Sequence, residues 1–540
     1  MRRSILAVFI VIGAAVPVLA QARPDSLATL IQTGNRKAAL DKIRAGADVN
    51  EAQPDGTYPI HWAVYRVDYE LIEALIAKKA QVNVANEFGA TPIAEAAKLA
   101  DARIVKMLLD AGAGPEGANP DGETALMIAI KTGELPIVEM LIKAGANVNT
   151  VEKFHRQTPL MYAAAAGRNA GAMVKLLVSK DASLKPRALY SDWPSQITSE
   201  PRAQYRPTGG LTALLYAARS GCYDCVESMI GAGANVNTPT PEGVTPLMTA
   251  LENDHNDVAK LLLDHGANPG VWDWWGRTAL YIVVDRKAGG SSGGLRLGAA
   301  AIDGGRGGRG GRGGTPRVAS RVSHMDIINA LLAAGVDPSP ELNMHRPSRG
   351  GNSGRFIDPL LNTGCTPLLR ATMAGDMEVI GALLAKGASP NVNAMGLTAF
   401  LVAAGVGTGN RGGTGLAAQA SAGGAVNIPL MDLLLQHGAN VNAQVTGTKT
   451  YSMRIARAPS SNEGMTALHT AAQAGKVDLV RYLLDKGANP ELVDSNGRKA
   501  IDVVGGGARG GAAPAPPAAA ANPAIAAEIR ALLQNATSNK

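Results

Sequence analysis

The chain has 540 residues, more than one hydrophobic core of about 250–300 residues can organise, which excludes a single globular domain and leaves several domains or an array of repeats. Aromatic residues make up only 4%, and glycine is abundant, so we expect a core of small and aliphatic side chains between closely packed helices. The net charge is +7, but residues 286–321 alone hold eight Lys or Arg and one Asp. The rest of the chain has no basic excess that would indicate a nucleic-acid-binding face.

Residues 1–22 have the order of a secretory signal peptide. Two arginines precede an apolar run from Ile5 to Val16, and small residues follow it. The run is too short for a stable membrane span, and no later apolar run is long enough to be a transmembrane segment. We therefore expect cleavage after Ala20 or Ala22, with an uncleaved anchor as the alternative, and a periplasmic or secreted mature protein of residues 23–540.

A short threonine motif recurs along most of the remaining chain. In each copy the threonine is followed two residues later by an aliphatic or aromatic residue, and most steps between copies are 32–34 residues. Three longer steps equal one period plus inserted residues, and looser copies begin at Thr57 and Lys499. The clear copies begin at Thr91, Thr124, Thr158, Thr212, Thr245, Thr278, Thr366, Thr398 and Thr466. A repeated structural unit is therefore predicted.

Each unit predicts two short helices. The threonine hydroxyl can cap the first helix, and a proline, where present, occupies the first helical position. Apolar pairs spaced by three, such as Ile137 and Val138 with Leu141 and Ile142, define one face of a second helix. A glycine then ends the second helix, and a polar turn such as Pro-Asp-Gly leads to the next unit.

These units resemble ankyrin repeats. The family pattern T-P-L-H-x-A-A-x-x-G…V-V-x-x-L-L-x-x-G-A-x-x-N is matched closely by MTALHTAAQAGKVDLVRYLLDKGANP and well by TYPIHWAVYRVDYELIEALIAKKAQVN, whereas the family histidine remains only at His61 and His469. The resemblance runs from about Ser26 to Leu533. It implies an all-α ankyrin repeat solenoid of helix-turn-helix units with short β-hairpin turns, with about ten full repeats plus end caps. It also implies protein binding through the hairpin tips and the concave face of the first helices.

Five insertions interrupt the period. Two glycine-rich ones, near 286–322 and 405–427, fall between the two helices of one repeat, and we interpret them as flexible loops that do not divide the stack. The other three, near 185–210, 339–364 and 444–464, extend turns between repeats.

The first glycine-rich insertion contains the tract GGRGGRGGRGG, which resembles RNA-binding Arg-Gly segments. It has no interleaved aromatic residues, and an exported protein rarely meets RNA, so we do not expect nucleic acid as a partner. A solvated linker is the main interpretation. Contact of Arg306, Arg309 and Arg312 with an anionic polymer or surface is the alternative.

No group of residues predicts catalysis. Residues 290–294 and 407–412 match the nucleophile-elbow and dinucleotide-binding strings, but neither lies between a strand and a helix as those motifs require. The eight histidines form no metal-binding set. We therefore expect no enzyme activity, no cofactor and no metal.

Cys222 and Cys225 are spaced as Cys-x-x-Cys at the start of a second helix. A helix N-terminus lowers a thiol pKa, and an oxidising compartment permits a disulfide. Without a thioredoxin-like context, the sequence favours two small packed side chains, with a local disulfide left open. Cys365, three repeats away, is too distant to pair with either.

Three tryptophans, Trp272, Trp274 and Trp275, lie around one turn, in which Asp273 and Gly276 occupy the usual turn positions. Not all three can point inward from one short hairpin, and exposed tryptophan is favoured as an interface anchor. We therefore predict that these three residues bind a partner. Mutual stacking, or cover from the neighbouring insertion, is the alternative.

The sequence as a whole predicts a non-catalytic protein–protein interaction scaffold, which we expect to be a monomer. The alternative function is the binding of an anionic polymer or surface through the Arg-Gly loop, which would show a steep dependence on salt.

Overall fold

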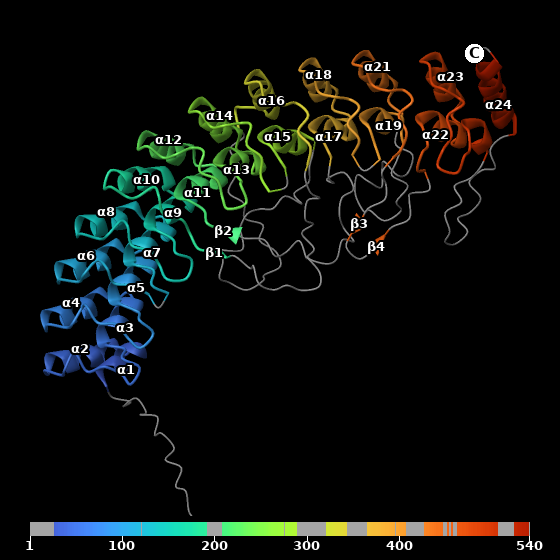
Figure 1. The fold of residues 1–540 in the computed structure, drawn as a ribbon. Coiled ribbons are helices and arrows are strands. Elements are labelled where there is room, and N and C mark those ends of the chain that lie inside the picture. The colour runs from blue at the N-terminus through green and yellow to red at the C-terminus, as the bar shows by residue number, and fades with distance from the viewer. Residues whose placement is uncertain are drawn as a thin grey trace, which may run out of the picture. The chain divides into compact units, whose positions relative to one another are not determined.

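The computed structural model describes residues 26–119, 121–191, 208–274, 276–288, 320–342, 364–394, 396–406, 426–446, 451–452, 455–456, 462–505 and 523–538. These residues belong to two compact units that divide after Ala182. Each unit is a stack of helix pairs, in which the first helices form one row and the second helices form a neighbouring row (Figure 1).

The first unit contains five helix pairs. They are α1 (Leu27–Gln32) with α2 (Arg36–Arg44), α3 (Pro59–Tyr65) with α4 (Tyr69–Ala77), α5 (Pro92–Lys98) with α6 (Ala102–Asp110), α7 (Ala125–Thr132) with α8 (Leu135–Lys143), and α9 (Pro159–Ala165) with α10 (Ala170–Val178).

The second unit continues the same pattern. Its described pairs are α11 (Ala213–Ser220) with α12 (Tyr223–Gly231), α13 (Pro246–Glu252) with α14 (Asn256–Asp264), α15 (Ala279–Lys287) with α16 (His324–Ala333), α17 (Pro367–Ala374) with α18 (Met377–Ala385), α19 (Ala399–Ala403) with α21 (Ile428–Gln436), and α22 (Ala467–Gln473) with α23 (Val477–Asp485). A 3₁₀ helix, η2 (Ala500–Val503), and α24 (Pro523–Ser538) follow. Two antiparallel pairs of short strands are also present: β1 (Tyr190–Ser191) with β2 (Thr208–Gly209), and β3 (Tyr451–Ser452) with β4 (Ile455–Ala456). No described helix is both long and apolar enough to cross a membrane.

The repeated threonine begins the first helix of each unit, as the sequence predicts. All nine threonines of the clear copies have extended backbone angles, and each hydroxyl accepts a hydrogen bond of 3.2–3.4 Å from the backbone N–H three residues later. This bond satisfies one of the N–H groups that a helix start leaves without a partner. In the looser copy at Thr57 the helix begins one residue later, after Tyr58.

The core of each unit is formed between successive pairs. In the first unit α3 packs against α1 and α5, and α7 packs against α5 and α9; in the second unit α13 packs against α11 and α15. Small side chains such as Ala96, Ala129 and Ala163 are fully buried in the first helices, where they permit close approach. Leu108 and Leu141 are fully buried in the second helices. Each pair therefore buries its apolar face against its neighbours.

The described ends of the inserted segments are held by polar contacts. At the first glycine-rich insertion, Arg286 Nε donates to Asp254 Oδ1 at 2.7 Å, and His324 Nε2 lies 3.3 Å from the same oxygen. Burial alone would raise the pKa of Asp254, but the contacts with His324 and Arg286 lower it well below its usual range. Helices α15 and α16 pack together although the insertion separates them in sequence.

Backbone hydrogen bonds close the bases of other insertions. At the second glycine-rich insertion, the N–H of Asn427 donates to the carbonyl of Ala403 at 3.1 Å. At the extended turn near 339–364, the N–H of Gly364 donates to the carbonyl of Leu342 at 2.8 Å. These bonds join the described ends of each segment.

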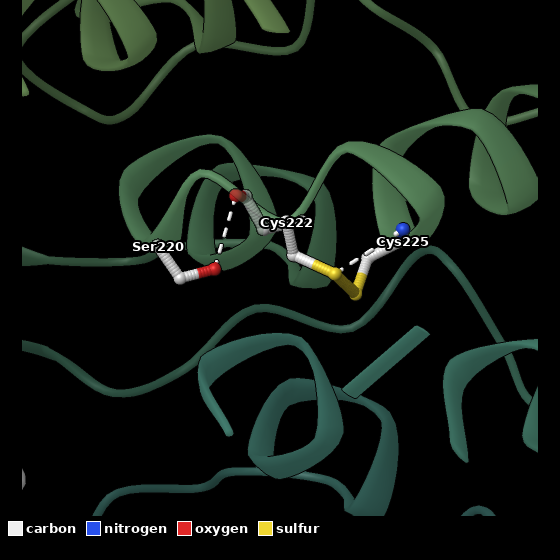
Figure 2. Close-up of a disulfide and its surroundings, with 4 residues drawn as sticks. Ser220, Cys222 and Cys225 are labelled. Atoms are coloured by element: carbon white, nitrogen blue, oxygen red, sulfur yellow. Dashed lines mark hydrogen bonds between the residues drawn. A yellow bond between two sulfur atoms is a disulfide. The ribbon is translucent and has the colours of Figure 1, made fainter. Parts of the chain in front are cut away.

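The structure corrects the interpretation of Cys222 and Cys225 as two packed side chains, because it places their sulfurs in a disulfide with a Cα–Cα distance of 5.2 Å (Figure 2). Cys222 is the N-cap of α12, and Cys225 is the third residue of that helix. The two side chains are thus about one helical turn apart, on the same side of the helix start. Cys365 is buried and takes no part in a disulfide.

The two family-type histidines each connect one repeat to the next. His61 Nδ1 accepts a hydrogen bond of 3.0 Å from the N–H of Tyr58, and its Nε2 lies 3.1 Å from the carbonyl of Ala90 in the following repeat. His469 makes the corresponding contacts with the N–H of its helix cap and, at 3.0 Å, with the carbonyl of Arg498. A backbone N–H can only donate, so Nδ1 must be unprotonated in both residues.

We predict that protonation of these histidines destabilises the array. Burial lowers the pKa of both His61 and His469, whereas an unfolded histidine titrates near a pKa of about 6.5. Below about pH 6.5 the unfolded chain therefore binds protons that the folded chain does not, and stability falls with pH until the lowered native pKa values are reached.

The measurement is the melting temperature of the wild type and of a His61→Met, His469→Met variant between about pH 8 and pH 5. Methionine is the matched residue because Met127, Met161 and Met248 occupy the same helix position in other repeats. The wild type should lose more stability than the variant on acidification. Equal slopes would show that the two histidines do not carry the effect.

Candidate functional site

The tryptophan-rich turn forms a tight hairpin between α14 and α15. Trp272 and Thr278 form an antiparallel bridge. Inside it, the N–H of Asp273 donates to the carbonyl of Arg277 at 3.1 Å, and the N–H of Gly276 donates to the carbonyl of Asp273 at 2.8 Å. Gly276 has a φ of +76°, a left-handed conformation that costs glycine little. The turn thus has a defined conformation.

A buried ionic network fixes the base of this hairpin. Asp273 Oδ1 accepts from the backbone N–H of Arg277 at 2.9 Å, and its Oδ2 accepts from Arg277 Nε at 2.7 Å. Arg277 Nη1 also donates to Glu252 at the end of α13. Burial alone would lower the pKa of Arg277, but Glu252 and Asp273 raise it. The guanidinium therefore remains charged and joins the hairpin to the preceding repeat.

The hairpin also contacts the preceding turn through its backbone. The N–H of Trp274 donates to the carbonyl of Glu242 at 2.8 Å. A Cβ atom added at Gly243, which has a φ of +84°, would lie only 3.3 Å from the Cα of Asp273. Glycine at this position therefore permits the two turns to approach closely.

The tryptophans that the structure describes are accessible on this hydrogen-bonded support. The side chains of Trp272 and Trp274 are 62% and 60% exposed, whereas Asp273 between them is 1% exposed. Trp275, the third residue of the predicted partner site, lies outside the described residues.

A second hairpin, at Asp494–Arg498, has the same turn without the exposed aromatic residues. Asp494 accepts from the N–H and the Nε of Arg498 at 2.9 and 2.8 Å, as Asp273 does from Arg277. The Arg498 side chain is 41% exposed, however, whereas that of Arg277 is 7% exposed. The tryptophan hairpin is therefore the more deeply anchored of the two.

Sequence reasoning identified Asp273 as a turn residue but missed the role of Arg277. The sequence does contain a signal for this role, because two turns, Asp-Trp-Trp-Gly-Arg and Asp-Ser-Asn-Gly-Arg, have an arginine four residues after the turn aspartate. Glu252, the third member of the network, lies 25 residues before Arg277 in another repeat. It contacts Arg277 only because the two repeats stack.

Exposed aromatic residues also occur at hairpin tips of the first unit. Phe88 and Phe154 are 63% and 59% exposed. A shallow hollow of about 680 Å³, lined by residues that include Phe88, Val151 and Lys153, lies along these turns. Among the ion pairs of the described residues, none forms a buried network beneath either phenylalanine like the one beneath the tryptophans.

The described residues contain no group of three or more His, Cys, Asp or Glu arranged to hold a metal ion. Two other buried charged residues in the second unit pair with each other: Arg370 Nε donates to Asp285 Oδ1 at 2.6 Å between α17 and α15. This pair connects two first helices and has a structural role. Arg306, Arg309 and Arg312, the predicted anionic-polymer contacts, lie outside the described residues, as does the predicted signal peptide 1–22.

Comparison with known families identifies the repeats. A model of three tandem ankyrin repeats matches residues 27–119, 101–188, 196–273, 214–289 and 401–494, which together cover more than half of the chain. A single-repeat ankyrin model matches residues 363–394. The chain belongs to the ankyrin repeat family. Ankyrin repeats generally mediate protein–protein interaction, and ankyrin repeat proteins are typically non-enzymatic scaffolds.

Individual relatives match only parts of this ankyrin repeat chain. BCL-6 corepressor-like protein 1 of Homo sapiens is 36% identical over 79 residues, 15% of this chain and 4% of that protein. The B-cell lymphoma 3 protein homolog of Mus musculus is 30% identical over 150 residues, 24% of this chain and 33% of that protein. The chain thus spans at most a third of these relatives. The human ASB11 ankyrin repeat domain, a crystal structure, has a TM-score of 0.35 at 23% identity, covering 45% of this chain and 98% of that domain.

We predict that Arg277→Met loosens the tryptophan hairpin. Removing one partner from a buried ionic network leaves uncompensated charge and typically costs about 3–5 kcal/mol. Arg498→Met is the matched control, because it removes the corresponding side-chain bond to the turn aspartate, at a position where water can replace the guanidinium.

Urea unfolding of both variants, followed by tryptophan fluorescence and circular dichroism, tests this prediction. Arg277→Met should shift the fluorescence transition to a lower urea concentration than Arg498→Met does. A larger loss in Arg498→Met would contradict the assignment of Arg277 as the main support of the hairpin.

Proposed function

We propose that this ankyrin repeat protein is an exported, monomeric scaffold that binds a partner protein through the hairpin bearing Trp272, Trp274 and Trp275. The observation that carries the proposal is the combination of large exposed side chains with a buried, hydrogen-bonded base. Trp272 and Trp274 are more than half exposed, while Asp273 and Arg277 beneath them are buried. The concave face of the first helices extends the proposed surface.

Physical reasons favour such a hairpin as an anchor. Tryptophan buries a large apolar area when it enters a partner's pocket, and it is enriched among the residues that dominate binding energy. A hairpin that is already ordered loses little conformational freedom on binding, so more of the contact energy contributes to affinity. Exposed tryptophan without a partner would instead be a cost to solubility.

The proposed export of the protein rests on residues 1–22, whose order of charged, apolar and small residues is that of a signal peptide. The Cys222–Cys225 disulfide supports the proposal, because disulfides persist in oxidising compartments such as the periplasm or the extracellular space.

We predict that a Trp272→Ser, Trp274→Ser variant loses partner binding. Each tryptophan that acts as a hot spot contributes about 2 kcal/mol or more, which corresponds to about a thirtyfold change in affinity, so the double variant should bind more than about thirtyfold more weakly. The control is Phe88→Ser, Phe154→Ser, which removes two equally exposed aromatic residues from other hairpin tips.

The experiment is crosslinking capture from the cell-envelope and extracellular fractions of the source organism, followed by affinity measurement with the captured protein. The wild type and the phenylalanine variant should bind equally, and the tryptophan variant should not. Equal binding by all three proteins would place the interface elsewhere. Binding that survives in the tryptophan variant but falls steeply with salt, and falls again on replacing Arg306, Arg309 and Arg312, would favour the anionic-surface alternative.

A further inference from the structure

The Cys222–Cys225 disulfide has an asymmetric environment. Cys225, the third residue of α12, is fully buried, whereas Cys222, the residue before the helix, is partly exposed. Tyr223 and Asp224 between them are both exposed. Cys222 is therefore the residue of the pair that a molecule in solution reaches more readily, and Cys225 lies in the protein interior.

Cys222 occupies a position at which other repeats carry an anion. In α4, α6 and α18 the corresponding N-cap residues are Asp68, Asp101 and Asp376, and each carboxylate accepts the backbone N–H three residues later at 3.0–3.2 Å. In α12, Cys222 Sγ accepts the equivalent bond from the N–H of Cys225 at 3.3 Å. The repeat architecture thus offers a hydrogen-bond donor and the positive end of a helix to whatever negative charge forms on this sulfur.

The disulfide contributes little that the fold needs. It joins residues only three apart, and the stabilisation from a disulfide grows with the length of the loop it closes. The remaining contacts of α12 with α11 and α14 are independent of it. When the bond is reduced, Cys222 can still cap the helix, because a thiolate accepts the same N–H bond as the aspartates of the other repeats.

We propose that Cys222–Cys225 is a redox-active pair that exchanges with thiols and disulfides in solution through Cys222. The substrate class is a small thiol or an exposed protein thiol. This site is separate from the tryptophan hairpin and does not depend on the function proposed for that hairpin.

The reduction proceeds in two exchanges. In the first, an external thiolate attacks Sγ of Cys222, and the new sulfur–sulfur bond forms as the Cys222–Cys225 bond breaks. The electron pair of the broken bond leaves on Cys225. The Cys225 sulfur then takes up the proton that the external thiol released. A second external thiolate then attacks the external sulfur of the mixed disulfide and releases Cys222 as a thiolate. Two electrons pass from two external thiols to the protein, and the external thiols leave as a disulfide.

The test uses single variants of the full-length mature protein and reduced and oxidised glutathione as the probe. After incubation with oxidised glutathione, Cys225→Ser should accumulate a mixed disulfide on Cys222, seen by mass spectrometry of the intact protein. Cys222→Ser should react much more slowly, because Cys225 is buried. Equal modification of the two variants, or none in either, would overturn the proposal.

A second measurement separates redox activity from helix capping. Cys222→Asp restores the carboxylate cap found in α4, α6 and α18, so it should match the wild type in circular dichroism and melting temperature while forming no mixed disulfide. In the wild type, reduced glutathione should make Cys222 available to alkylation without loss of helical signal, whereas the buried Cys225 should stay protected. A disulfide that is reduced only in denaturant would contradict the proposal.

Discussion

Stacking is the constraint on which the rest of this molecule depends. A pair of helices of seven to nine residues, such as α5 and α6, is too short to be stable alone, and its apolar face is buried only when another pair packs against it. Leu108 and Leu141, in the second helices of the first unit, are fully buried in the stack. The same requirement explains the small residues of the first helices, since larger side chains would hold the pairs apart.

Stacking also creates the candidate site. It brings Glu252, from one repeat, within hydrogen-bond reach of Arg277 in the next, and it sets the N–H of Trp274 against the carbonyl of Glu242. Burial of these charges excludes water and strengthens their interaction, so a turn that would otherwise be mobile is fixed. The exposed tryptophans on that turn combine two properties that favour recognition: a large contact area and a low cost of ordering.

Much of this fold could be predicted from the sequence because each repeat uses local signals. These signals act within a few residues: the cap threonine, the proline or small residue that follows it, and the glycine that ends the helix. All nine predicted helix starts agree with the structure. The sequence could not show which side chains meet between repeats. The salt bridge of Arg277 with Glu252 depends on how two repeats approach in three dimensions, so the sequence analysis missed it. Whether Cys222 and Cys225 form a disulfide also depends on three-dimensional approach, and the sequence favoured two packed thiols instead.

The central claim is that the tryptophan hairpin is ordered before any partner binds, and amide hydrogen exchange of the free protein tests it most directly. The N–H groups of Trp274 and Arg277 donate to Glu242 and Asp273 in the structure. If the hairpin is preorganised, both amides should exchange far more slowly than in an unstructured loop, with protection comparable to that of neighbouring helices. Exchange at the rate of an unstructured peptide would show that the hairpin is mobile in the free protein and would contradict the account.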